Sequence, residues 1–409
     1  MKTLREINKE EIQNESAGWL NNLRQKAYER FASLGFPTNR LEAWKYINLE
    51  PILGSAFLAE EGSAPSLSFA GAAGQGFLLC DLGKALRERE TLLKGVLGAS
   101  CAAEENPFAL VNTFSFRGGV FVYVPDHVTL EAPIHLSFTG EGREAEPPVF
   151  YPRILVVAGK CARIKIIADF IGRGQGKFFS NAVAEIHLGE GACLDFLQVQ
   201  RSESDANILF STNRFYLKEY ASMNAISFTQ GGGVTRNETS VEFEGQGGFA
   251  SLKGLGVLRG QSQVFSHVAA RHRAPHCTSR QFYKMVLSGR AKSEFNSLVA
   301  VPKGSQKSDS NQMSRNLLLS DTAEAFARPQ LRIDTDDVQC VHGATVGQLE
   351  KDELFYLRSR GFSKELARFV MTYAFAQEVL EEVGEPALKA ALEKLTEEEI
   401  RLSLRGVTK

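Results

Sequence analysis

The feature that most constrains how this chain can fold is a pattern that recurs through its middle. Five stretches each hold a short β-rich run, a tight turn with one small residue, and a second β-rich run; they begin at Ile154, Ala184, Arg214, Ser240 and Lys284. The small residues at the turns are Ala162, Ala192, Ala221, Gly248 and Ala291. Because one such unit cannot bury its apolar face alone and stacked copies can, the pattern favours a β-helix or a related strand solenoid over residues 114–346. An antiparallel β-sandwich, which also consists of short strands, stays open as an alternative.

Helical patterns flank this core on both sides. Before it, apolar residues recur every three or four positions, which predicts a helix within an N-terminal region of residues 1–53; they are Trp19, Leu20, Leu23, Ala27, Phe31 and Leu34. Residues 54–113 begin with a run rich in Gly, Ala and Ser, and we interpret them as a linker and transition segment. After the core, residues 347–409 return to helix, with Ser363 as an N-cap and an apolar stripe from Leu366 to Val383.

Two potential metal donors, Cys340 and His342, stand two residues apart in a segment that reads as β. A strand sends residues i and i+2 to the same face, so a thiol and an imidazole are expected side by side. These donors suit iron, zinc and iron–sulfur chemistry, but two of them cannot close a site. The rest must come from elsewhere in this chain or from a partner. The alternative is a buried cysteine beside a histidine bonded to backbone.

A second group of donors, His267, His272, His276 and Cys277, suggests a zinc site. Its spacing matches none of the common zinc frames, and it contains no H-E-x-x-H. On a strand, His272 and His276 would share one face and the other two residues the opposite face. Three interleaved arginines disfavour a nearby dication: Arg271, Arg273 and Arg280. We therefore expect a polar rung or a partner surface here rather than a zinc hydrolase.

Composition excludes several classes of protein. The formal net charge of −1 over 409 residues gives no basic excess for nucleic acid. No run of eighteen apolar residues predicts a membrane span, and the first thirty residues lack the apolar core of a secretory signal. We expect a cytoplasmic protein, and in such a protein six cysteines without C-x-x-C spacing indicate reduced thiols rather than a disulfide framework. The glycine-rich residues 172–177 lack the spacing of a phosphate loop, so no nucleotide site is expected.

Four segments carry a resemblance to a known family. FPTNRLEAWKY (36–46), HRAPHCTSRQFYKMVLSGRA (272–291), QKSDSNQMSRNLLLS (306–320) and DDVQCVHGATVGQLEKDELFYLRSRG (336–361) are similar to segments of the SufB/SufD family of the SUF iron–sulfur cluster assembly system. The version CVHGATVG resembles the SufD branch, since the SufB branch usually carries Glu where this chain has Gly343. The segments span most of the chain.

The resemblance implies a fold and a function for this chain. The fold would be a right-handed parallel β-helix between helical regions, and the function that of a cytoplasmic scaffold subunit without catalytic activity of its own. The scaffold would pair with a SufB-type subunit. When the chain is alone, a homodimer is expected by analogy, because paralogues that pair with each other often share a self-complementary edge. It would recruit a SufC-type ATPase and receive sulfide indirectly from a cysteine desulfurase system.

The resemblance also implies roles for particular residues. His342, with Cys340 beside it, would bound a transient iron–sulfur cluster shared with the partner, and no motif indicates whether reduced flavin takes part. The ATPase would dock on the C-terminal helical region, at Phe355, Tyr356, Leu357, Arg358, Arg360, Gly361, Phe369 and Tyr373. The alternatives are a SufB-like primary scaffold and a polysaccharide-active β-helix enzyme.

Overall fold

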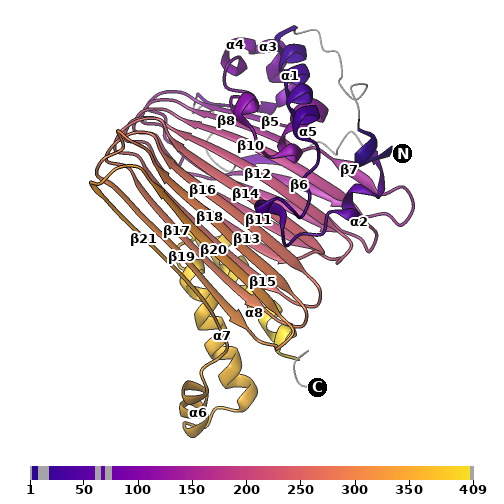
Figure 1. The fold of residues 1–409 in the computed structure, drawn as a ribbon, viewed down its shortest axis with the longest axis vertical. Coiled ribbons are helices and arrows are strands. Elements are labelled where there is room, and N and C mark those ends of the chain that lie inside the picture. The colour runs from indigo at the N-terminus through magenta and orange to yellow at the C-terminus, as the bar shows by residue number, and fades with distance from the viewer. Residues whose placement is uncertain (1, 8–17, 60–65, 70–75, 406–409) are drawn as a thin grey trace.

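The core of the molecule is a parallel β-solenoid with helices at both ends (Figure 1), in a computed structural model that describes residues 2–7, 18–59, 66–69 and 76–405. Its coils form two sheets around a shared interior. The first sheet holds, in order, β10 (Phe179–Leu188), β12 (Ile208–Leu217), β14 (Val234–Phe243), β16 (Gln263–His272), β18 (Lys292–Val301) and β20 (Glu324–Ile333). The second holds β6 (Ile134–Glu141), β9 (Arg163–Arg173), β11 (Cys193–Ser202), β13 (Ser222–Gly231), β15 (Phe249–Leu258), β17 (Thr278–Leu287), β19 (Ser308–Leu318) and β21 (Val338–Gly347). Neighbouring strands pair in parallel, so the stacked-strand prediction is confirmed and the antiparallel sandwich is wrong.

The turns from the first sheet to the second explain the repeat. Each turn places one residue in the left-handed backbone region and then a buried small residue on which the next coil stacks. The left-handed residues are Cys161, Gly191, Tyr220, Gly247 and His276, with φ between 54° and 70°. The buried residues that follow them are Ala162, Ala192, Ala221, Gly248 and Cys277.

One copy of the predicted repeat is therefore wrong. Ala291 lies in the opposite turn, from β17 back to β18, and the fifth residue in the series of small residues is Cys277. A search for Ala or Gly at the turn misses a cysteine in that position. The predicted distance between the copies that begin at Ser240 and Lys284 is therefore longer than one coil. Cys277 is fully buried in the interior, where its thiol serves as a small apolar group.

Additional strands and helices close the N-terminal end of the solenoid. The strands are β1 (Lys2–Thr3), β2 (Ala56–Ala59), β3 (Ser66–Phe69), β4 (Leu78–Asp81), β5 (Val120–Val124), β7 (Pro148–Phe150) and β8 (Arg153–Ala158). The helices are α1 (Gly18–Leu34), α2 (Glu50–Leu53), α3 (Leu82–Glu88), α4 (Glu90–Leu93) and α5 (Pro107–Ser115), with 3₁₀ turns at Leu4–Glu6, Glu42–Trp44 and Cys101–Ala103. Residues 54–113, interpreted above as a linker and transition segment, thus contain several elements, while 60–65 and 70–75 lie outside the described residues. In α5, the side chain of Asn112 donates to the Asn181 carbonyl at 2.7 Å, which fixes this helix on β10.

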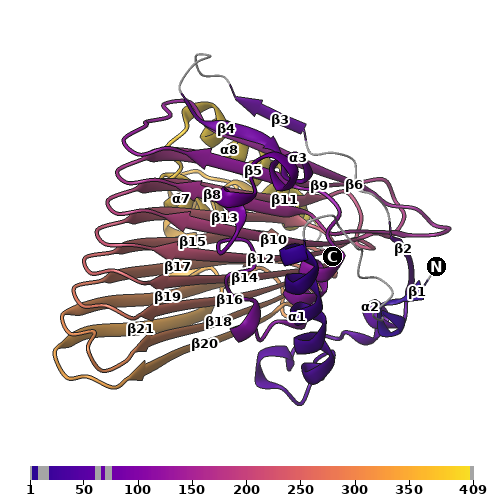
Figure 2. The same cartoon turned by 90° about the horizontal axis from the view of Figure 1, so that it is seen from above.

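The two outer faces of the solenoid are covered by opposite ends of the chain (Figure 2). On the first sheet, Trp44 and Phe108 pack against Phe210. On the second sheet lie α7 (Lys364–Leu380) and α8 (Pro386–Arg405), whose apolar residues cover the outward side chains of β11, β13 and β15. Apolar contacts therefore cover part of each outer face.

The C-terminal end of the solenoid is open. β20 and β21 end their sheets, and no strand in the described part of the chain pairs with their outer edges. Most residues of β21 are exposed. The last coil therefore presents two unpaired strand edges, and α6 (Lys351–Ser359) projects beyond it (Figure 1). Among the described helices, none combines the length and the apolar character that a membrane span requires.

Candidate functional site

Cys340 and His342 lie on β21, the edge strand of the open coil. They pair in register with Ser310 and Gln312 of β19, both of which are fully buried in the interior. Cys340 is half-buried against the solenoid core, whereas His342 is exposed. The two donors therefore share the inward face of the last rung, at the mouth of the solenoid.

The interior changes character along the two columns that end at these donors. From β11 to β21, the column of Cys340 contains Leu194, Met223, Ala250, Ser279, Ser310 and Cys340. The column of His342 contains Phe196, Ala225, Leu252, Gln281, Gln312 and His342. Both columns are apolar in their first three positions and polar in their last three. The donors thus rest on buried polar groups rather than on a dry core.

Hydrogen bonds satisfy many of these buried polar groups. The Nε2 of His272 lies 2.9 Å from Ser279 Oγ, which in turn donates to Ser310 Oγ at 2.9 Å. Beside this chain, Gln312 donates from Nε2 to Ser297 Oγ at 2.5 Å, across the interior from one sheet to the other. Such networks hold side chains in one arrangement because an unpaired buried group is costly. The rung beneath Cys340 and His342 is therefore held by side-chain hydrogen bonds, although Gln312 Oε1 has no partner among the described residues.

The environment of Cys340 keeps its thiol protonated. Burial raises the thiol pKa, and the carboxylate of Asp309 raises it further, while a hydrogen bond from the Ser310 backbone opposes the shift. Because the thiolate is the metal ligand, Cys340 must lose its proton when it binds a metal. Among the residues that the structure describes, no three His, Cys, Asp or Glu side chains come together as a metal site.

The four donors from His267 to Cys277 point in different directions. His267 lies on the outer face of the first sheet, 3.2 Å from Glu294 Oε2, whereas His272 points inward to Ser279. The strand ends at His272, so His276 and Cys277 lie in the following turn. The expectation that His272 and His276 share a strand face is therefore wrong, because the left-handed backbone at His276 turns the chain.

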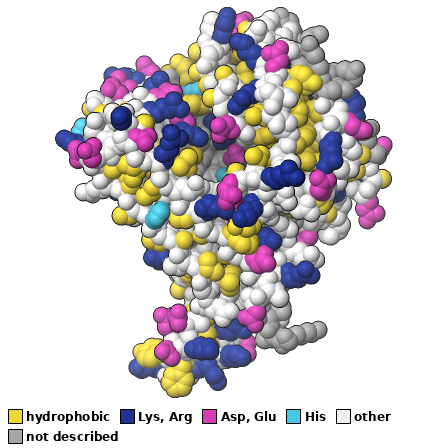
Figure 3. All heavy atoms as spheres, viewed as in Figure 1, with side chains coloured by type: hydrophobic (Ala, Val, Ile, Leu, Met, Phe, Trp, Pro, Cys, Tyr) yellow, Lys and Arg dark blue, Asp and Glu magenta, His cyan; other side chains and the backbone are white. Residues whose placement is uncertain are grey.

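The residues expected to dock an ATPase lie in two places. Phe355 and Tyr356, on the projecting helix α6, are 73% and 57% exposed, beside the exposed Arg358 and Arg360 (Figure 3). Leu357 of the same helix is half-buried, and Gly361 follows the end of α6 with φ +94°. Phe369 and Tyr373 instead stack on one another in α7, and Arg401 of α8 covers Phe369 at 4.1 Å. Of the aromatic residues expected to dock an ATPase, only the two on α6 are thus exposed.

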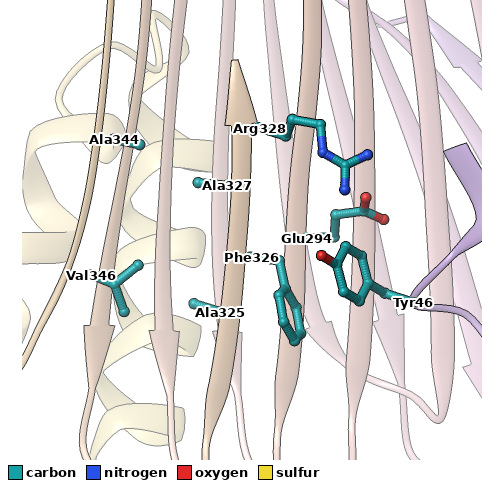
Figure 4. A pocket seen from close by; sticks show the side chains of 8 residues that line it. All are labelled: Tyr46, Glu294, Ala325, Phe326, Ala327, Arg328, Ala344 and Val346. Carbon is teal, nitrogen blue, oxygen red and sulfur yellow. The ribbon is translucent and has the colours of Figure 1, made fainter. Parts of the chain in front are cut away.

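Sequence reasoning missed a pocket of about 320 Å³ beside the open edge of β20 (Figure 4). Its walls include the stacked rings of Tyr46 and Phe326, with centroids 4.0 Å apart, and the side chains of Glu294 and Arg328. Tyr46 belongs to the segment FPTNRLEAWKY, which is the only sequence signal that leads toward the pocket. The contribution of Glu294 depends on how that segment packs across the last coils, which no local pattern encodes.

Comparison with known proteins identifies the family. A model described as the SufBD core domain of SUF system FeS cluster assembly matches residues 138–375, and one of the SufBD protein N-terminal region matches residues 2–67. The chain is 27% identical to the iron–sulfur cluster assembly protein SufD of Escherichia coli, over 89% of each chain, and 24% identical to SufD of Bacillus subtilis, over 95% of each. A SufBD family protein of Synechocystis sp. is 29% identical, over 91% of this chain and 89% of its own. Since the core model covers more than half of its length, the chain belongs to the SufBD family of iron–sulfur cluster assembly proteins, and it is SufD-like.

Proposed function

We propose that this chain is a scaffold subunit that pairs with a SufB-type subunit through its last coil and holds a nascent iron–sulfur cluster at the junction. The observation that carries the proposal is the position of Cys340 and His342 on an edge strand with no strand beyond it in the described chain. A thiolate and an imidazole are suitable donors for iron, and a second polypeptide at this edge would supply the remaining ligands. The cluster is the cargo of the complex rather than a resident cofactor.

The pairing itself follows from the two open strand edges. An unpaired edge offers a row of backbone N–H and C=O groups, and another strand can add to it. Edge pairing would continue both sheets into the partner, so the interiors of the two solenoids would meet at the rung of Cys340 and His342. A homodimer could form in the same way when no SufB-type subunit is present.

In the complex, Cys340 and His342 would divide the chemistry. His342, which is exposed, is the ligand available to iron without rearrangement. Cys340 starts as a protonated thiol and becomes a ligand only when a base takes its proton, a role that a free imidazole can fill. Sulfide would reach the site from a cysteine desulfurase system. No step in this scheme requires the chain to act as an enzyme.

Docking of a SufC-type ATPase on α6 would connect nucleotide hydrolysis to the cluster site. Only Gln348, Leu349 and Glu350 separate β21 from α6, so a force on the helix acts directly on the strand that bears the donors. Behind α6, helix α7 is anchored to the solenoid, because Lys284 of β17 donates to the Phe375 carbonyl at 2.8 Å and pairs with Glu378. Hydrolysis would thus strain the last coil and open the junction. The complex would work in the cytoplasm.

Replacement of His342 in the reconstituted complex tests the proposal. His342→Ala should remove most of the iron and acid-labile sulfide bound per complex, while Gln339→Ala, on the outward face of the same strand, should leave both unchanged. Pairing is measured separately by size-exclusion chromatography, so loss of the cluster is not confused with loss of the complex. Full cluster content in His342→Ala would remove the role proposed for this residue.

A further inference from the structure

Glu294 is a buried acidic residue whose hydrogen-bonding capacity is only partly satisfied by its neighbours. Its side chain is 1% exposed, on the outer face of β18, and it faces the pocket at the edge of β20 (Figure 4). One oxygen, Oε2, lies 3.2 Å from His267 Nε2, whereas Oε1 has no hydrogen-bond partner among the described residues. An unpaired buried carboxylate oxygen is expensive, so its retention at a pocket wall indicates that something fills this position.

The cations around Glu294 are already engaged by other carboxylates. Arg328 lies 2.6 Å from Glu42 in its ion pair, and Lys292 lies 2.8 Å from Glu324. The third cation, Arg236, pairs with Glu238 and stacks at 3.5 Å on the Trp44 ring. Each of these positive charges is therefore already paired with a carboxylate other than Glu294, which Arg236 and Arg328 affect only through their longer-range fields. The pocket is electrostatically complementary to one additional cation.

Building on the pairing proposed above, we infer that this pocket receives an arginine side chain of the SufB-type subunit, which pairs with Glu294 and stacks on the rings of Tyr46 and Phe326. A planar guanidinium fits such a wall, because it can stack on an aromatic face and donate two hydrogen bonds in its plane. The pocket opens at the free edge of β20, where a strand of the paired subunit would add. At about 320 Å³ it is at the small end of the range of ligand pockets and has room for one long side chain.

The protonation of Glu294 supports this occupant. Burial raises its pKa to about 7, against the lowering effect of Arg236 and Arg328, while Glu42 raises it slightly and His267 is held neutral by its own burial. In the free subunit the carboxyl group is thus partly protonated at neutral pH. An entering guanidinium stabilises the carboxylate, so binding releases a proton. Pairing should therefore strengthen as the pH rises through 7, up to about tenfold per pH unit below that value.

The test measures the dissociation constant of the full-length chain and the SufB-type subunit of the same organism. At pH 8, Glu294→Gln should weaken pairing at least tenfold, because the arginine loses its charged partner in a dry site. The matched control is Glu131→Gln, which removes an exposed carboxylate at the N-terminal end of the solenoid and should change the constant less than twofold. Phe326→Leu, at a half-buried position, should weaken pairing at least threefold through the lost aromatic face.

A double-mutant cycle identifies the arginine. Each arginine in the last two coils of the SufB-type subunit is changed to Gln, alone and together with Glu294→Gln, and one of them should show strong coupling to Glu294. The inference would be overturned if the Glu294→Gln and Phe326→Leu proteins still paired tightly, or if no arginine were coupled to Glu294. Either result would leave the proposed edge pairing intact. If the unmodified chains do not pair at all, both the inference and the proposed function fail.

Discussion

Replacement of Cys277 tests whether its thiol only fills space in the core or takes part in cluster assembly. The side chain is fully buried at the turn from β16 to β17, and its sulfur lies 3.4 Å from the Gly245 carbonyl oxygen. The coils below and above form hydrogen bonds with this turn. The backbone N–H of Thr278 donates to the Gly248 carbonyl at 2.8 Å, and the backbone N–H of Asp309 donates to the Cys277 carbonyl at 3.0 Å. There is consequently little room for a larger side chain.

The expected magnitudes follow from this packing. Cys277→Ala removes one buried heavy atom, which costs about 1 kcal/mol in transfer free energy and residual cavity. Cys277→Leu adds two heavy atoms at a closed corner and should cost about 3 kcal/mol through strain. Cluster assembly by Cys277→Ala should equal that of the unmodified chain, because the thiol contacts only backbone oxygens and apolar groups.

Urea denaturation followed by circular dichroism gives the change in unfolding free energy, and iron and sulfide analysis of the reconstituted complex gives the activity. Cys101→Ala, another buried thiol outside the solenoid turns, is the matched control. A folded Cys277→Ala protein that cannot assemble clusters would show that the thiol takes part in cluster assembly. A Cys277→Leu protein as stable as Cys277→Ala would show that the corner is not close-packed.

Three further predictions concern pH and docking. Burial lowers the pKa of His272 to about 4, so below pH 6.5 the unfolded chain binds more protons than the folded one. The free energy of unfolding should therefore fall by about 3 kcal/mol as the pH drops from about 6.5 to 4. The same loss in the His272→Gln protein would contradict this assignment. Because burial raises the thiol pKa of Cys340, its alkylation by iodoacetamide should reach half its maximal rate only above about pH 8.5, the ordinary thiol value, and an earlier midpoint would refute the burial. Replacing Phe355 and Tyr356 by Ala should weaken binding of the ATPase at least tenfold, whereas Leu402→Ala, at an exposed apolar position on α8, should not. Equal losses would argue against α6 as the dock.

The sequence predicts the parts of this structure that depend on periodicity. Stacked β-rich runs predict the solenoid, and strand alternation predicts that Cys340 and His342 share a face. Periodicity fails where a residue is judged by its type rather than its position: Cys277 belongs with the alanines at the turns, although its thiol suggests a metal site. It fails again at His276, where the left-handed backbone ends the strand pattern.

The pocket at Glu294 could not be predicted because it depends on long-range packing. Tyr46 and Phe326 are 280 positions apart in the chain and stack only because the N-terminal segment crosses the outer face of the last coils. A glutamate within a strand normally indicates an exposed position, and only this crossing buries it. Likewise, the separation of the aromatic residues of α6 from Phe369 and Tyr373 depends on where α8 packs.

The shift of the inner columns from apolar to polar side chains implies a gradient of local stability along the solenoid axis. Coils that stack leucine, methionine and phenylalanine should open only with global unfolding, whereas coils held by serine and glutamine contacts lose less hydrophobic free energy when they separate. Amide hydrogens of β19 and β21 should accordingly exchange faster than those of β11 and β13. The molecule would then combine a rigid base with a rim that can fray and re-form, so that a cargo could be released without unfolding the rest.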